Sequence, residues 1–260
     1  MTSAYYTQQD HDDLTTRVPQ DCPLLLDKCA ELVRAVSRRM RDLSWDLHTY
    51  WERPGIITGR SAAATNAIYG ISMPFLRSRE QALLVERMMG RDGVSAPASV
   101  DWHHHPVIEL RLTPENFAIE LILPPSAWWD QRNLVGKLSV ARHRETLRSL
   151  LARMDGDFRF GFWDGIHLSD LHLTSMQLVR SGALYELMNT FGDGQDWMRV
   201  GVWYEPEDER LTAGQITVEV VNRMAALYPL YNFFLWTSNN NFQSFHPANA
   251  WMYNSRDMQQ

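Results

Sequence analysis

The segment "VIELRLTPENFAIELIL", residues 107–123, decides the fold of this chain. In each half, alternate positions are apolar, which is the pattern of a strand that buries one face. Between the halves, "TPEN" at residues 113–116 consists of residues typical of turns. We therefore predict an antiparallel hairpin with strands over residues 107–112 and 117–123.

The hairpin also predicts where its charged side chains meet. If Leu112 pairs with Phe117 across the turn, Glu109 lies opposite Glu120, on the face away from the core. Two directly opposed carboxylates repel each other, so a cation should lie between them. Arg111 or a bound metal ion would supply that charge.

The residues before the hairpin extend this hypothesis to a metal site. In "DWHHHPVIEL", residues 101–110, strand alternation places His103 and His105 on the face of Glu109, provided that the strand begins early enough. With Glu120, these side chains have the composition of a divalent metal site that activates water for hydrolysis. Pro106 opposes this interpretation because it removes a ladder donor. The alternative is a solvated sheet face on which Arg111 pairs with both acids.

A second candidate site comes from an Arg-x-Gly-x-Trp pattern that occurs twice, as "RFGFW" at residues 159–163 and "RVGVW" at residues 199–203. The long connection between them allows a crossover helix, so we expect adjacent parallel strands in register. Their arginines would pair with an anionic group, their tryptophans would stack on a flat one, and their glycines would permit close approach. The predicted ligand-binding residues are Arg159, Gly161, Trp163, Arg199, Gly201 and Trp203. The alternative is that a helix packs across the glycines and nearby acids pair with the arginines.

Helical periodicity appears in several other segments. Apolar residues recur at three- and four-residue steps from Leu25 to Leu47, which predicts a long amphipathic helix from about residue 21 to 50. Its apolar stripe must lie on a sheet or on a second copy of the chain, which leaves a homodimer open. Further helices are expected over residues 78–90, 140–154, 176–188 and 213–227, and a buried strand is expected over residues 229–236.

Together these elements predict an α+β fold. We expect a mixed sheet, formed by the hairpin and the later strand-helix units, with helices packed on it and a long N-terminal amphipathic helix. We expect residues 1–20 to form a flexible arm, residues 21–240 a single domain, and residues 241–260 an irregular C-terminal tail.

Composition restricts the partners. The chain has 260 residues and a formal net charge of −6, which argues against general nucleic-acid binding. No signal peptide or membrane-spanning run is visible, so we expect a cytoplasmic protein without membrane contact. Cys22 and Cys29 lie seven positions apart on one predicted helix, roughly 10 Å, which is too far for a disulfide.

The function classes that remain are few. The chain lacks the Walker phosphate loop, the G-x-G-x-x-G fingerprint and the G-x-S-x-G elbow, so whether it is an enzyme stays open. The leading interpretation is a ligand-binding or protein-interaction domain that uses the Arg/Trp face for an unknown small molecule or protein. The alternative is a metal-dependent hydrolase built on His103, His105, Glu109 and Glu120.

Overall fold

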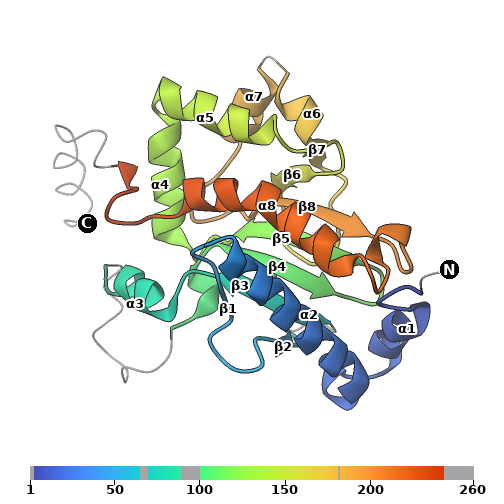
Figure 1. The fold of residues 1–260 in the computed structure, drawn as a ribbon. Coiled ribbons are helices and arrows are strands. Elements are labelled where there is room, and N and C mark those ends of the chain that lie inside the picture. Colours follow the sequence, from blue (N-terminus) through green and yellow to red (C-terminus); the bar gives the residue numbers. More distant parts are fainter. Residues whose placement is uncertain (1–2, 65–69, 89–99, 181, 243–260) are drawn as a thin grey trace.

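The computed structural model describes residues 3–64, 70–88, 100–180 and 182–242. Its strands form one antiparallel sheet in the order β1-β3-β4-β5-β8-β6-β7, and β2 also pairs with β3 (Figure 1). The α+β class is confirmed. The strands are β1 His48–Thr49, β2 Ile57–Thr58, β3 Ile71–Leu76, β4 Val107–Leu112, β5 Phe117–Leu123, β6 Arg159–Phe162, β7 His172–Thr174 and β8 Met198–Tyr204.

The predicted hairpin is confirmed in both its bounds and its register. β4 and β5 occupy residues 107–112 and 117–123, with Leu112 opposite Phe117 and Glu109 opposite Glu120. Because both strands lie in the middle of the sheet, every residue in them is buried.

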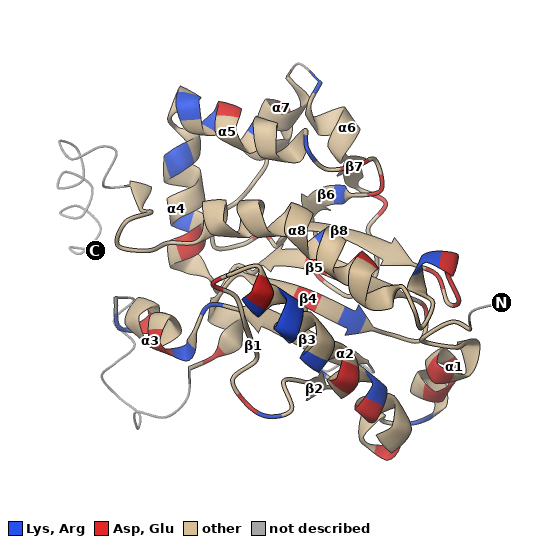
Figure 2. Ribbon diagram, in the orientation of Figure 1, with Lys and Arg blue, Asp and Glu red and all other residues tan. Residues whose placement is uncertain are grey.

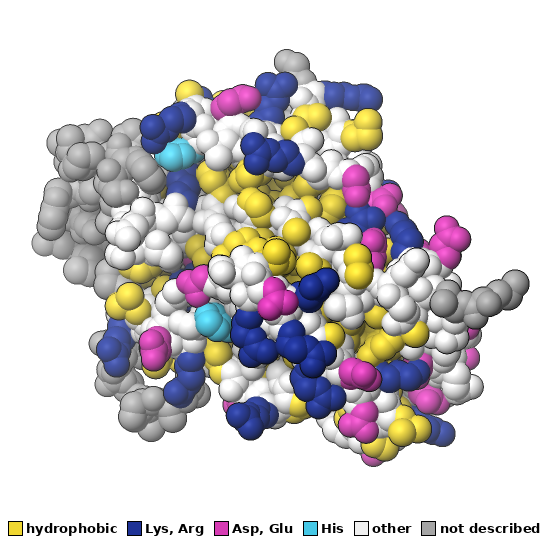
Figure 3. All heavy atoms as spheres, viewed as in Figure 1, with side chains coloured by type: hydrophobic (Ala, Val, Ile, Leu, Met, Phe, Trp, Pro, Cys, Tyr) yellow, Lys and Arg dark blue, Asp and Glu magenta, His cyan; other side chains and the backbone are white. Residues whose placement is uncertain are grey.

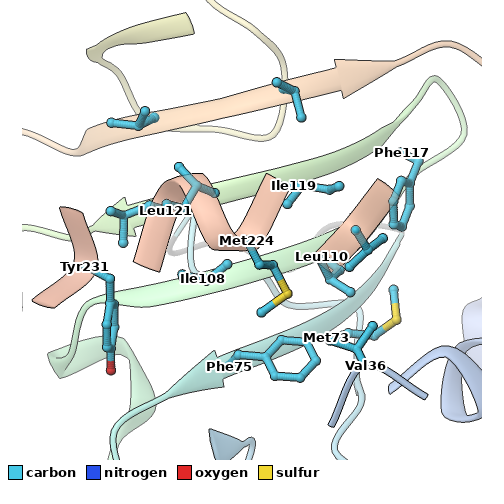
Figure 4. Close-up of a cluster of buried hydrophobic side chains, with 14 of the residues drawn as sticks. Val36, Met73, Phe75, Ile108, Leu110, Phe117, Ile119, Leu121, Met224 and Tyr231 are labelled. Atoms are coloured by element: carbon cyan, nitrogen blue, oxygen red, sulfur yellow. The ribbon is translucent and has the colours of Figure 1, made fainter. Parts of the chain in front are cut away.

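The helices pack mainly on one face of the sheet. They are α1 Gln8–Thr16, α2 Pro23–Asp42, α3 Arg79–Met88, α4 Trp128–Leu138, α5 Ala141–Leu151, α6 Ser175–Leu178, α7 Ala183–Asn189 and α8 Ile216–Phe234, with 3₁₀ turns at Pro19–Asp21, Trp102–His104 and Glu209–Leu211. α2 and α8 lie across the sheet (Figure 1). Between them and the strands, Val36 of α2 and Met224 of α8 meet apolar side chains of β3, β4 and β5 (Figure 4).

The long N-terminal helix is shorter than predicted and its partner is internal. α2 ends at Asp42 because Ser44 has φ 54°, a left-handed conformation that does not continue an α-helix. Its apolar stripe, including Leu32, Val36 and Met40, is buried against the sheet and α8 of the same chain. The hypothesis of a dimer through this stripe is therefore wrong.

The prediction of a buried strand over residues 229–236 is also wrong. Those residues continue α8 as far as Phe234, with Pro229 inside the helix. Pro229 and Ala225 both lie on the exposed side, so water can hydrogen-bond the Ala225 carbonyl that the proline leaves without a helical donor.

The N-terminal segment differs from the expected arm. Residues 8–16 form α1, which begins with a capping box between Thr7 and Asp10. Leu14 is fully buried, and the His11 Nδ1 atom is 2.7 Å from the Thr113 carbonyl oxygen. Of the predicted C-terminal tail, residues 243–260 lie outside the described residues.

The two repeated segments form adjacent strands, β6 and β8, but the parallel pairing is wrong. They are antiparallel, with Arg159 opposite Gly201 and Gly161 opposite Arg199. The reason is β7, which pairs with β6 as an antiparallel strand and reverses the chain before α6 and α7. The helical connection therefore joins β7 to β8, and β6 lies between them.

Two further observations concern the chain as a whole. Within the described ranges, none of the helices combines the length and apolar character needed to cross a membrane. Cys22 and Cys29 are both free and buried, as the spacing predicted.

Candidate functional site

Four charged side chains meet on the sheet face opposite α2 and α8. Glu109 and Arg111 come from β4, Glu120 from β5 and Arg199 from β8, and each is at most 1% exposed. We call them the charged quartet. Arg111 lies between the glutamates, with Nη1 3.0 Å from Glu109 Oε2 and Nη2 2.7 Å from Glu120 Oε1, while Arg199 donates to Glu120 from the other side.

Two loops close over the charged quartet. From the first, the Ser61 hydroxyl and the Ala62 backbone N–H donate to Glu109 at 2.8 and 3.2 Å. From the second, the Ile166 carbonyl accepts from Arg111 at 3.0 Å, and the Gly165 carbonyl accepts from Arg199. The quartet is thus balanced in charge and bonded to the protein itself, as buried charges must be.

The electrostatics of Glu120 follow from this arrangement. Burial by itself raises the pKa of the Glu120 carboxyl, but the neighbouring Arg111 and Arg199 guanidinium groups outweigh burial and lower it below its usual value. Glu120 therefore stays ionised, and its negative charge holds both arginines in place.

The predicted metal ligands are not brought together. β4 begins at Val107, after Pro106, so both histidines precede the strand. His103 Nδ1 lies 2.9 Å from Asp101, and His105 Nε2 lies 3.7 Å from Glu86. Among the described residues, no three His, Cys, Asp or Glu side chains are grouped so as to hold a metal ion. The opposed carboxylates of Glu109 and Glu120 instead pair with Arg111, as the alternative interpretation predicted. That interpretation was wrong about solvent, because this face of the sheet is buried.

The predicted Arg/Trp face is formed only in part. The rings of Trp163 and Trp203 lie 5.9 Å apart, and the Arg199 guanidinium is 4.8 Å from the Trp163 ring and 6.0 Å from the Trp203 ring. Arg159 does not join them, because the antiparallel register turns it to backbone carbonyls of the preceding turn, including that of Gly156 at 2.7 Å.

The glycines of this face are covered by the protein's own side chains. A Cβ atom on Gly201 would lie 2.7 Å from Glu120 Cγ, and one on Gly161 would lie 2.7 Å from the Trp163 ring. The close approach that glycine permits is therefore made by Glu120 and Trp163. The space at the two glycines is therefore taken by the protein itself. Trp163 and Trp203 remain partly exposed, so ligand binding by this face stays a prediction.

An open depression lies elsewhere, between α4, α5 and α7. We call it the α5–α7 groove. Its volume is about 590 Å³, and apolar side chains make up much of its lining. They include Leu138, Leu147, Leu178, Leu184, Met188 and Phe191. Because α7 has no fully buried residue, its apolar side chains are shared between the protein core and this groove.

Positive charge surrounds the α5–α7 groove. Arg144 and Arg148, one turn apart on α5, line it together with Arg180, and Glu145 is the one acid among the lining residues. Basic residues of α4 and α5 gather at the top of the molecule (Figures 2 and 3). Sequence reasoning missed this groove, although the arginine spacing in the predicted helix over residues 140–154 was a signal for a basic helix face.

Comparisons with protein-family models and with curated protein sequences give no match. Two features of the molecule remain as candidate sites. The charged quartet is closed, and its two carboxylates are bonded within the protein, whereas the α5–α7 groove is open to solvent. Of the quartet's donors, the Nε atoms of Arg111 and Arg199 are buried without an acceptor among the described residues.

Proposed function

We propose that this chain is a cytoplasmic binding protein whose small-molecule ligand lies in the α5–α7 groove. The observation that carries the proposal is the groove itself, about 590 Å³ of open volume with a largely apolar lining. Small-molecule sites are typically concave, mostly apolar and roughly 300–1,000 Å³ in volume. The two free, buried cysteines support a reducing compartment.

The lining supports a ligand with a substantial apolar part. Leu184, Met188 and Phe191 are only partly buried by the protein. Covering them removes apolar surface from water, which contributes about 25 cal/mol for each Å² buried. Exposed apolar patches of this kind commonly mark binding sites.

The test uses Nile red, a neutral apolar dye that fluoresces when it leaves water. We expect the wild-type protein to enhance its fluorescence in a saturable way. Leu184→Glu places a charge in the apolar lining and should weaken dye binding by about tenfold or more.

Leu171→Glu is the matched control. Leu171 is 84% exposed and lies outside the groove lining, so this variant should bind the dye like the wild type. Far-ultraviolet circular dichroism must show the same fold for all three proteins. No saturable binding by the wild type, or the same loss in both variants, would overturn the proposal.

A further inference from the structure

The arginines of the groove are poorly compensated. The groove is lined by three arginines, Arg144, Arg148 and Arg180, and by one acid, Glu145. The chain as a whole has a net charge of −6. The excess of positive charge is therefore local. A local excess of this kind attracts an anion most strongly where apolar walls limit solvent screening.

These guanidinium groups keep unused donors. Arg144 uses Nη1 for the Leu138 carbonyl at 2.7 Å, and Arg148 uses Nε and Nη2 for the Val179 carbonyl. Among the described residues, the carboxylate nearest to any of the three is that of Glu145, which lies 3.8 Å from Arg148 Nη1. Within the described part of the chain, Arg144 and Arg180 form no ion pair with an acid.

Resting on the proposed binding function, we infer that the ligand is an amphiphile with a carboxylate at one end of an apolar body. The leucine, methionine and phenylalanine side chains of the groove cover the body. The arginines receive the carboxylate, because a guanidinium group offers paired N–H donors that match its two oxygens.

Isothermal titration compares three amphiphiles of equal chain length, with dodecanoate and dodecylamine kept below their critical micelle concentrations and dodecanol below its solubility limit. Dodecanoate should bind about tenfold more tightly than dodecanol, and dodecylamine should bind more weakly than either. Added salt should weaken the binding of dodecanoate and leave that of dodecanol nearly unchanged. Acetate, which has the anion without the apolar body, should not bind measurably.

Two double variants identify the groups that recognise the anion. Arg144→Gln with Arg180→Gln should lower dodecanoate affinity about tenfold and leave dodecanol affinity unchanged. Arg142→Gln with Arg153→Gln removes the same charge from exposed positions outside the groove lining, and should keep the wild-type preference.

The outcomes separate this inference from the proposed function. Equal binding of dodecanoate and dodecanol would overturn the inference and leave an apolar binding groove. Equal losses in the two double variants would show that net charge, rather than the groove arginines, attracts the anion, and would also overturn it. No binding of any amphiphile or dye would overturn both. If, in addition, Leu184→Glu converted a dimer to a monomer, the occupant would be a second copy of the chain.

Discussion

Glu120 holds two arginines in the sheet interior, and its single charge is shared between them. Buried ion pairs gain little over apolar replacements, but removal of one partner leaves an uncompensated charge out of contact with water. We expect Glu120→Gln to lower the free energy of unfolding by about 3 kcal/mol or more, measured by urea denaturation. The side chain keeps its size, so the loss would come from charge rather than from a cavity.

Glu115→Gln is the control for this substitution. Glu115 contacts His167 at 2.8 Å, but its side chain is 64% exposed, so water screens the pair. We expect a change within about 0.5 kcal/mol. Similar losses in the two variants would mean that the quartet contributes no more than a surface pair.

Lys137 predicts a dependence of stability on pH. Burial lowers the pKa of its ammonium group to about 8, against a smaller opposing effect of Asp130, and its Nζ atom donates to the Phe233 carbonyl at 2.6 Å. Above pH 8 the folded chain has lost this proton, whereas the unfolded chain keeps it up to about pH 10.4. Since the unfolded state binds more protons in that window, this residue's contribution to stability rises with pH.

Replacing Lys137 by methionine isolates its contribution to the pH dependence of the unfolding free energy. The difference in unfolding free energy between the wild type and Lys137→Met should move in favour of the wild type as pH rises from about 7.5 to about 9.5. Other groups are common to both proteins and cancel. One of them is Cys29, whose thiol pKa is raised by burial to about 12 in the folded chain but lies in this range in the unfolded one. A difference that stays constant with pH would contradict the lowered pKa.

At the scale of elements, α2 belongs to the core of its own chain. Met40 is 2% exposed and lies in the main hydrophobic cluster. We expect Met40→Glu to destabilise the fold by about 4 kcal/mol or more, because it buries an unpaired charge.

Leu24→Glu adds the same charge to the same helix, where the side chain is 80% exposed. Its effect on the unfolding free energy should stay within about 0.5 kcal/mol. Thermal unfolding followed by circular dichroism compares the two variants. A stable Met40→Glu protein would show that the helix does not need this contact with the sheet.

Elements were predictable from the sequence where local pattern and tertiary contacts agree. The strands over residues 107–112 and 117–123 have the predicted bounds because alternation, turn residues and burial all favour them. The segment at residues 199–203 is also a strand, within β8. The prediction was wrong around Pro229, where exposure of one helix face lets a helix tolerate a residue that usually ends it. The predicted helix also extended too far beyond Asp42, because Leu47, which fitted the helical period, is buried in the core from a non-helical segment.

At the scale of the molecule, the candidate sites depend on contacts between distant segments. Strand parity and the hairpin register placed Glu109 opposite Glu120, since both are local properties. No local pattern specifies the two loops that close over the charged quartet, because they lie about 50 positions away on either side. Residues 61–62 bond Glu109, and residues 165–166 bond the two arginines. The α5–α7 groove likewise exists only once α4, α5 and α7 are placed together.

The arrangement also predicts how stability is distributed. β4 and β5 are buried along their whole length and paired on both edges, whereas α7 has no buried residue and β7 lies at the edge of the sheet. We expect native-state hydrogen exchange to be slowest in β4 and β5 and fastest in α7 and β7, because amides exchange through openings that disrupt the fewest buried contacts.

The same experiment tests the expectation of a single domain. In one cooperative unit, the slow amides of β4 and β5 share a single opening free energy with those of α2 and α8, since all four elements contribute to one hydrophobic cluster. If α2 and the strands instead opened with separate free energies, the chain would contain two units. A ligand in the α5–α7 groove should slow exchange in α7 without changing β5, because α7 lines the groove and β5 does not.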